Sequence, residues 1–147
     1  MTEPQIYEGH DLEVLADLPN YYGWIIEVFR PYIKGRTMEI GTGIGTISKL
    51  IIEDTEELIL VEPSAHLTEY LPTSISKRPK VSIFNETLEQ RLPRMADHSC
   101  DTVIMVNVLE HIEDDGSALE ALHRVLKPGG HLLLFVPALK FLYSELD

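Results

Sequence analysis

The sequence predicts one α/β domain: a doubly wound, mainly parallel, five-stranded sheet in the order 3-2-1-4-5 with helices on both faces. Three observations predict this class. Short runs of aliphatic residues alternate with segments whose apolar residues recur every three or four positions, as strands alternate with helices in such folds. The runs are continuous rather than alternately apolar and polar, which is typical of parallel strands buried on both faces. A glycine-rich loop separates the first run from the helix after it.

Length, composition and charge narrow the class of protein. The chain has 147 residues, 44% of them hydrophobic and 24% charged, which suits one domain with one core. Asp and Glu number 24 against 12 Lys and Arg, and the formal net charge of −12 disfavours nucleic acid as a partner. The single cysteine, Cys100, cannot form an internal disulfide, which fits a reducing compartment. No signal-peptide pattern is present and the longest apolar stretch, 132–139, is too short for a membrane span, so we expect a cytoplasmic protein.

The first part of the chain predicts a helix, a strand and a second helix. Apolar residues recur at helical spacing from residue 20, so we expect an N-terminal helix at about 20–34 and the core at about 36–137, within a single domain 1–147. The apolar run 37–40 predicts the first strand. The next helix is predicted by an apolar stripe at spacings of three and four, formed by Ile44, Ile47, Leu50 and Ile51.

The rest of the chain continues this alternation. Strands are predicted at 58–61, 81–84, 102–106 and 132–136. The dipeptide 63–64 opens a short helix that continues to Leu71. Ser117 and Glu120 have the spacing of a capping box, which predicts the start of the helix before the fifth strand. The segment 127–130 is expected to end that helix and to turn the chain.

Three glycines follow the first predicted strand. In a doubly wound sheet the ligand lies beyond the carboxyl ends of the strands, where the strand order reverses, so this loop is the first place to look for a site. Gly41, Gly43 and Gly45 allow a tight turn and let a ligand approach the backbone, although a plain turn would also explain them. Glu62 ends the next strand about 20 residues further along the chain, where its carboxylate can accept hydrogen bonds from both hydroxyls of a ribose. Together these features predict an adenosine-containing cofactor.

The glycine spacing distinguishes between cofactors. A dinucleotide site has the pattern G-x-G-x-x-G/A, but position 46 is Thr46 and the pattern here is G-x-G-x-G. Glu39 adds a second carboxylate beside the loop, where it would oppose a pyrophosphate but could hold an ammonium group, directly or through water. A cationic nucleoside that carries an amino acid therefore fits better than NAD.

Four segments of the chain together resemble the class I S-adenosylmethionine (SAM)-dependent methyltransferases of the small-molecule type. The resemblance spans residues 21–137. It rests on MEIGTGIG at 38–45, LVEP at 60–63, CDTV at 100–103 leading to NVLEH at 107–111, and LHRVLKPGGHL at 122–132.

This resemblance implies SAM as the cofactor and places its parts along the loops. Glu62, with Pro63 beside it, would bind the ribose hydroxyls, and Val106 and Asn107 would line the sulfonium end. The residues implied along the methionine part and the ribose are Glu39, Gly41, Thr42, Gly43 and Gly45.

The adenine end departs from the family pattern. The family often has an acidic residue after the third strand, whose carboxylate accepts a hydrogen bond from the adenine amino group. The backbone N–H of the next residue then donates a hydrogen bond to the adenine ring. By count these positions are Thr87 and Leu88. Because threonine replaces the acid, Glu86 or Glu89 are the candidates to substitute for it.

Methyl transfer needs mainly alignment, because the sulfonium is already an activated leaving group. Where the acceptor is a hydroxyl, a base helps, and His111 at the mouth of the fourth strand is the candidate catalytic residue. A histidine there is equally explained as a residue that hydrogen-bonds the backbone at a helix start. Glu110, His111 and Asp114 lack a second histidine at ligand spacing, so no metal site is expected.

The C-terminal part predicts an incomplete sheet. The familiar methyltransferase sheet has seven strands, and the final two-strand hairpin is not found here. The last ten residues, 138–147, remain apolar, so we expect a truncated chain whose fifth strand is an unpaired edge. Such an edge predicts a homo-oligomer that forms through this strand or through a face that includes Phe141.

The leading hypothesis is a SAM-dependent methyltransferase with a small-molecule acceptor and with no nucleic-acid or membrane partner. Two alternatives stay open: a NAD-dependent oxidoreductase, and a non-catalytic SAM-binding or oligomerisation module. The sequence does not identify the acceptor.

Overall fold

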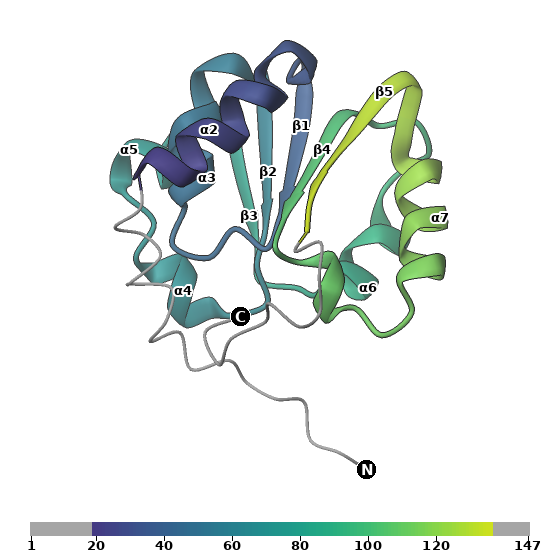
Figure 1. The fold of residues 1–147 in the computed structure, drawn as a ribbon. Helices are drawn as coiled ribbons and strands as arrows, with labels where there is room; N and C mark the ends of the chain where they lie inside the picture. The colour runs from purple at the N-terminus through teal and green to yellow at the C-terminus, as the bar shows by residue number, and fades with distance from the viewer. Residues whose placement is uncertain (1–18, 137–147) are drawn as a thin grey trace, which may run out of the picture.

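A parallel sheet organises the chain. The computed structural model describes residues 19–136, with side chains from residue 21 onward. The described strands pair in parallel in the order β3-β2-β1-β4-β5, which confirms the predicted fold class and strand order (Figure 1). Their bounds are β1 Arg36–Ile40, β2 Glu57–Val61, β3 Val81–Phe84, β4 Cys100–Val106 and β5 Leu126–Phe135.

The strand order reverses beside β1. Ile40 pairs with Val61 of β2 on one side and with Met105 of β4 on the other. The carboxyl ends of these three strands therefore meet at one rim of the sheet, which is where a doubly wound fold binds its ligand.

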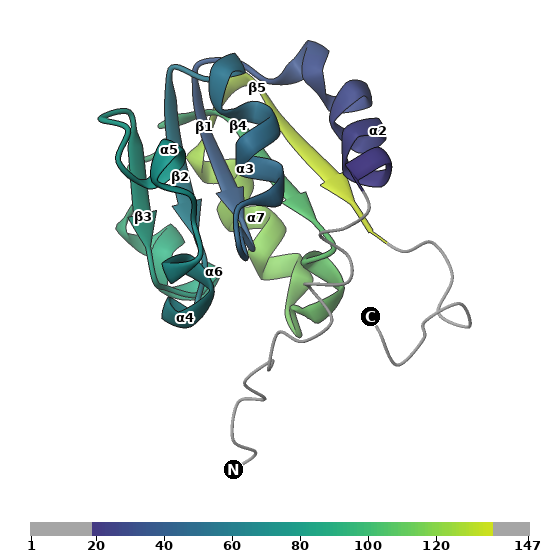
Figure 2. The same cartoon turned by 90° about the vertical axis from the view of Figure 1, so that its left-hand side faces the viewer.

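Helices cover both faces of the sheet. One face carries α2 Pro19–Phe29, α3 Thr46–Ile51 and α5 Thr73–Ser76, the other carries α6 Leu88–Arg91 and α7 Asp115–Val125, and α4 Ala65–Glu69 follows β2 (Figures 1 and 2). The described residues also form four short 3-10 turns, which are η1 Arg30–Tyr32, η2 Ile52–Asp54, η3 Leu92–Arg94 and η4 Leu109–His111. No helix among residues 19–136 is long and apolar enough to cross a membrane.

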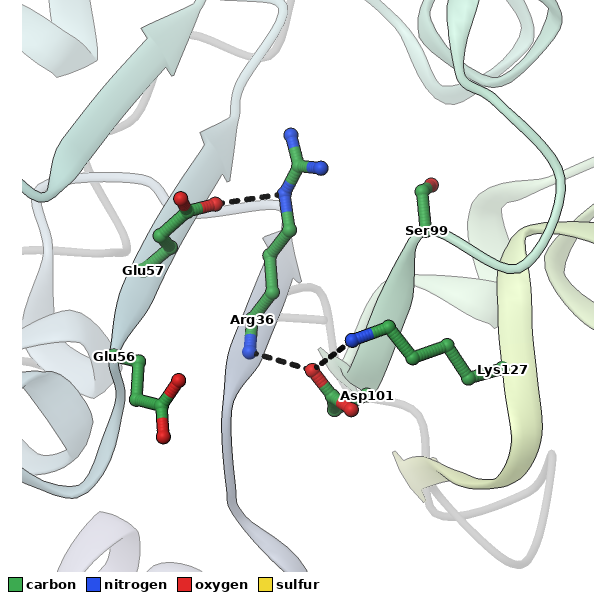
Figure 3. Close-up of a pocket in the computed structure, with 6 residues that line it drawn as sticks. All are labelled: Arg36, Glu56, Glu57, Ser99, Asp101 and Lys127. Carbon is green, nitrogen blue, oxygen red and sulfur yellow. Dashed lines mark hydrogen bonds and ion pairs between the residues drawn. The ribbon is translucent and has the colours of Figure 1, made fainter.

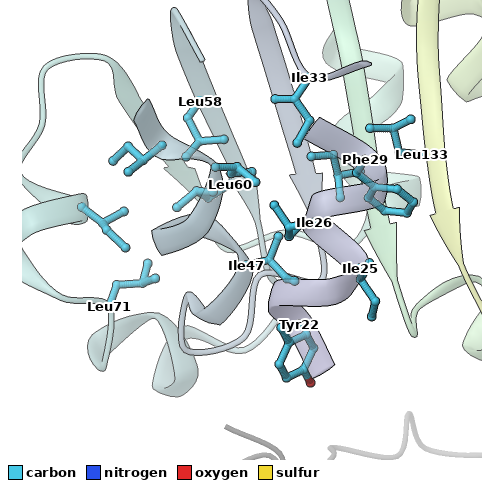
Figure 4. Packing of buried hydrophobic residues seen from close by; sticks show 14 residues of the cluster. Tyr22, Ile25, Ile26, Phe29, Ile33, Ile47, Leu58, Leu60, Leu71 and Leu133 are labelled. Atoms are coloured by element: carbon cyan, nitrogen blue, oxygen red, sulfur yellow. The ribbon is translucent and has the colours of Figure 1, made fainter. Parts of the chain in front are cut away.

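Two apolar clusters hold these layers together. Successive side chains of a strand point to opposite faces. Leu58 and Leu60 of β2 therefore pack under α2 and α3, and Ile59 and Val61 pack under α6 and α7 (Figure 4 shows the first cluster). Continuous aliphatic runs are thus required by burial on both faces, as the sequence predicted.

The start of α7 differs from the prediction. The capping box expected at Ser117 and Glu120 is wrong, because the helix begins at Asp115 and its N-cap is Asp114. The carboxylate of Asp114 accepts a hydrogen bond from the Ser117 backbone N–H at 3.0 Å. Both residues can cap a helix, so residue type alone does not distinguish them.

The fifth strand is longer than predicted. β5 begins at Leu126, so the segment 127–130, which we predicted as a turn, lies inside the strand. A register shift opposite residues 100–102 of β4 accommodates it, since proline and glycine are tolerated at bulges and sheet edges. Residues 137–147, with Phe141, lie outside the described part of the chain.

Candidate functional site

The glycine loop 41–45 closes over the carboxyl ends of β1 and β2. Its three glycines have positive φ angles of 74°, 54° and 86°, in the left-handed region that glycine adopts most readily. The Gly41 N–H donates to the Val61 carbonyl at 2.9 Å. A Cβ on Gly41 would overlap the Cγ2 methyl of Val108, which follows β4. Only glycine fits this position, because both its backbone angle and the space beside it exclude a side chain.

Glu62 connects two turns at the rim. Its side chain is buried, with the residue only 7% exposed. One carboxylate oxygen accepts from the Gly43 N–H at 2.9 Å and the other accepts from the Ser64 N–H at 2.9 Å. A carboxylate has about four acceptor sites, so about two remain for the hydroxyls of a ligand.

Glu39 lies deeper, on the face of β1 that α3 covers. It is 3% exposed, and the Ser48 hydroxyl donates to its carboxyl group at 2.6 Å. Burial, with a smaller contribution from the charge of Glu62, raises the pKa of Glu39 to about 8 against the opposing effect of the Ser48 hydrogen bond. The Glu39 carboxyl is therefore mostly protonated at neutral pH before any cation approaches it.

A cavity of about 250 Å³ opens between the residues that follow β1, β2, β3 and β4. It brings together six of the predicted site residues: Gly41, Glu62, Pro63, Thr87, Leu88 and His111. The remaining predicted residues are not part of its lining: Glu39, Thr42, Gly43, Gly45, Val106 and Asn107. Its apolar walls, which the sequence analysis did not identify, are Ile40, Val61, Val108 and Ile112.

The β3 side of this cavity contains two candidates for recognising a base. Thr87 is the N-cap of α6, and its hydroxyl accepts from the Gln90 N–H at 3.3 Å in a capping box. Glu86 also lines the cavity, and its Oε2 atom is buried without a hydrogen-bond partner among the described residues. Arg94 holds the other oxygen of Glu86, and Arg91 lies 3.6 Å from Oε2. Of these two side chains, the one that keeps an acceptor without a hydrogen bond is therefore Glu86.

Two more buried oxygens end neighbouring strands. Thr42 Oγ1 follows β1 and Asn107 Oδ1 follows β4, and neither has a hydrogen-bond partner within residues 19–136. An unpaired buried polar atom is costly, so each of these oxygens calls for a partner such as a water molecule or a ligand.

His111 ends η4 and is exposed at the wall of the cavity. Its backbone N–H donates to the Val108 carbonyl at 3.0 Å. No group of three or more potential ligands for a metal ion is found in the described part of the chain.

A larger cavity, of about 540 Å³, lies at the opposite rim (Figure 3). There Arg36 pairs with Glu57 at 2.9 Å and Lys127 pairs with Asp101 at 2.8 Å. The charged groups largely neutralise one another, and no predicted site residue is present. The candidate site is therefore the smaller cavity at the carboxyl rim.

Proteins of known sequence resemble this chain over most of its length. A family model described as a methyltransferase domain matches residues 38–134, more than half of the chain. Probable polyketide synthase 41 of Dictyostelium discoideum is 29% identical over 130 residues, which cover 75% of this chain and 5% of that protein. An uncharacterized methyltransferase of Mycobacterium tuberculosis is 26% identical over 114 residues, which cover 78% of this chain and 44% of that protein. The chain thus spans less than half the length of these curated relatives.

Solved structures share the fold. A SAM-dependent methyltransferase from Mesorhizobium loti has a TM-score of 0.66 at 18% identity, covering 81% of this chain and 52% of that one. The phosphoethanolamine N-methyltransferase 1 of Haemonchus contortus, in complex with phosphoethanolamine and S-adenosylhomocysteine, has a TM-score of 0.71 at 18% identity, covering 80% of this chain and 26% of that one. The glycine loop, the acidic strand end and the sheet order all lie within the matched region, and the chain belongs to the methyltransferase domain family.

Proposed function

We propose that this chain is the cofactor-binding domain of a SAM-dependent methyltransferase that acts on a small-molecule acceptor. The observation that carries the proposal is the Glu62 carboxylate, which joins the glycine loop to the turn after β2 at the rim where the strand order reverses. The relationship to a segment of polyketide synthases supports a small organic acceptor, as does an acidic chain with a net charge of −12.

The residues at the rim fit this cofactor. Glu62 has acceptor capacity left for a pair of ribose hydroxyls, and Gly41 leaves the backbone open to close approach. Thr42 and Asn107 offer unpaired oxygens near the methionine end. Bound SAM would supply a methyl group activated by a sulfonium, so the chain itself need only bind, orient and exclude water. His111, at the cavity wall, is the candidate to take a proton from a hydroxyl acceptor.

Titration calorimetry with S-adenosylhomocysteine (SAH) and with NAD tests the proposal. We expect SAH to bind and NAD not to bind. Glu62→Ala should weaken SAH binding by roughly 1.5–3 kcal/mol, the range for hydrogen bonds to a charged group. Glu56→Ala is the matched control, because Glu56 is an exposed carboxylate at the opposite rim. Unchanged SAH affinity in Glu62→Ala would remove Glu62 from the site, and NAD binding would favour an oxidoreductase.

Recognition of the adenine gives a second, finer test. We expect Glu86→Gln to weaken binding of SAH by about 1–2 kcal/mol, because Glu86 Oε2 is an acceptor without a hydrogen bond on the β3 side. Thr87→Ser, which keeps the helix cap, should leave the affinity unchanged. The inosine analogue of SAH carries a carbonyl oxygen in place of the amino group, and the amide of glutamine can donate to that oxygen whereas the Glu86 carboxylate cannot. Glu86→Gln should therefore bind this analogue no more weakly than the wild type does. A Glu86→Gln loss that persists with the inosine analogue would contradict this assignment.

Turnover separates an enzyme from a binding module. A panel of small-molecule acceptors, assayed for SAH release with this chain and with any longer form, should yield methyl transfer. SAH binding without turnover in every form would favour the non-catalytic alternative. A cytoplasmic location stays a prediction.

We also propose that the chain self-associates through the edge of β5. Among the described strands β5 pairs only with β4, and the neighbouring surface exposes Trp24 (57%), which stacks edge-on against Phe135. Such an edge seeks a partner. Light scattering at protein concentrations on the order of tens of micromolar should therefore show a dimer. The substitution Trp24→Glu should weaken this dimer. Tyr70→Glu, at an equally exposed tyrosine (58%) after α4, should leave the dimer intact. A strictly monomeric wild type would contradict the proposal.

A further inference from the structure

A buried hydrogen bond between Ser48 and Glu39 crosses the base of the glycine loop 41–45. Glu39 lies in β1, just before the loop, and Ser48 lies in the first turn of α3, just after it. The Ser48 hydroxyl donates to the Glu39 carboxyl group at 2.6 Å, and the two residues are 0% and 3% exposed, respectively. One contact between side chains therefore joins the strand that enters the loop to the helix that leaves it.

The two ends of the loop are held in different ways. On the β2 side, backbone N–H groups of the loop donate to the Val61 carbonyl and to the Glu62 carboxylate. On the α3 side the N-cap is Gly45, so the helix begins without a side-chain cap. Among the described residues, the bond between Ser48 and Glu39 is the side-chain hydrogen bond that ties this end to β1. It matters here because glycine gives the loop backbone more freedom than other residues would.

The burial of both side chains makes this contact costly to lose. A serine within a helix commonly faces solvent or bonds to the backbone of its own helix, whereas Ser48 is fully buried and donates to a different element. Without its hydroxyl, the Glu39 carboxyl group would lose this donor beneath α3. A buried polar group that loses its partner destabilises the arrangement that buries it. The α3 end of the loop would then be free to move away from β1.

We propose that Ser48 is a positioning residue of the cofactor site: by donating to Glu39, it holds the α3 end of the glycine loop in the shape that receives the cofactor. This inference rests on the proposed function. Ser48 does not line the cavity, but Gly41 at the start of the loop does, so a displaced loop changes the wall that the ligand meets. When only a fraction of the molecules has the competent loop, the apparent affinity falls by that fraction.

Titration calorimetry with SAH measures the effect on binding. Ser48→Ala should weaken SAH binding about tenfold. Thr55→Val is the matched control, because Thr55 is also buried and its hydroxyl donates to the Ile52 carbonyl at 3.2 Å, beside Glu56 at the opposite rim. This control should leave the affinity unchanged. Ser48→Cys offers only a weak donor and should also weaken binding, which provides a test should the alanine variant not fold.

The pH dependence of stability tests whether Ser48 acts through Glu39. The pKa of Glu39, about 8 in the folded chain, is raised by burial, lowered by the Ser48 hydrogen bond and raised by the charge of Glu62. Loss of the hydroxyl should therefore raise this pKa above 8. The stability of Ser48→Ala should then keep falling above pH 8, where the contribution of Glu39 to the wild type levels off. In a Glu39→Gln background, the cost of Ser48→Ala should be the same at every pH.

Each other outcome has a defined meaning. Unchanged SAH affinity in Ser48→Ala, or an equal loss in Thr55→Val, would overturn the proposal. A cost of Ser48→Ala that is independent of pH when Glu39 is present would also overturn it, because packing alone would explain such a cost. Failure of SAH to bind the wild type would refute the proposed function instead, and the denaturation curves, which need no ligand, separate that failure from a missing bond between Ser48 and Glu39.

Discussion

Gly41→Ala is expected to abolish measurable SAH binding and to lower the free energy of unfolding by about 2–5 kcal/mol. A residue with a Cβ at a φ of 74° is strained by about 1–2 kcal/mol. The added methyl would also overlap Val108 Cγ2, and overpacking of this kind costs about 1–3 kcal/mol. Relief of the overlap would displace the loop from the rim. Chemical denaturation and titration calorimetry measure the two effects.

Gly23→Ala is the matched control for this substitution. Gly23 lies in α2, and a Cβ there would meet no atom within 4 Å. Alanine in a helix is more stable than glycine by roughly 0.5–1 kcal/mol, so this variant should be slightly more stable than wild type and should bind SAH normally. Normal SAH binding by Gly41→Ala would show that the loop does not approach the ligand.

Glu39→Gln is expected to remove a pH dependence of stability between about pH 4.5 and 8. The pKa of Glu39 rises from its ordinary value of 4.5 to about 8 in the folded chain, chiefly because the carboxyl is buried. As the pH increases through this window, the unfolded chain loses the proton first, so the folded state becomes less stable until the pH exceeds about 8. At about 1.4 kcal/mol for each tenfold change in the equilibrium, the full effect is on the order of 4–5 kcal/mol.

Denaturation curves at several pH values check this expectation. All variants share a repulsion that grows with pH because the net charge is −12, so the informative quantity is the difference between Glu39→Gln and wild type. That difference should favour the glutamine variant increasingly from pH 5 to 8. The exposed Glu113→Gln serves as the control and should follow the wild-type curve. Parallel curves for Glu39→Gln and wild type would contradict the raised pKa.

The sheet could be predicted from the sequence because its central strands β1, β2 and β4 are largely buried on both faces. Leu58-Ile59-Leu60-Val61 is apolar throughout, and both of its faces are buried. Helix boundaries were harder to predict, because a single hydrogen bond at the first turn can determine where a helix begins. Asp114 rather than Ser117 caps α7, and nothing in the local composition distinguishes the two.

The site could be predicted only in part, for a related reason. Gly41 and Glu62 are identified by their order after two strands, and the structure brings them together at one cavity. Whether Glu86 or Thr87 is open to a ligand depends on Gln90 and Arg94, which occupy the other acceptors through hydrogen bonds. The unpaired state of Asn107 Oδ1 depends on what surrounds β4 in three dimensions. Spacing along the chain carries no information about such competition.

The two hydrogen bonds that the Glu62 carboxylate accepts affect how quickly a ligand binds. Both turns that form the rim are already anchored to this one carboxylate. A ligand therefore meets a preorganised receptor and loses little affinity to ordering it. Association should be limited by diffusional encounter, with differences between ligands expressed in their residence times.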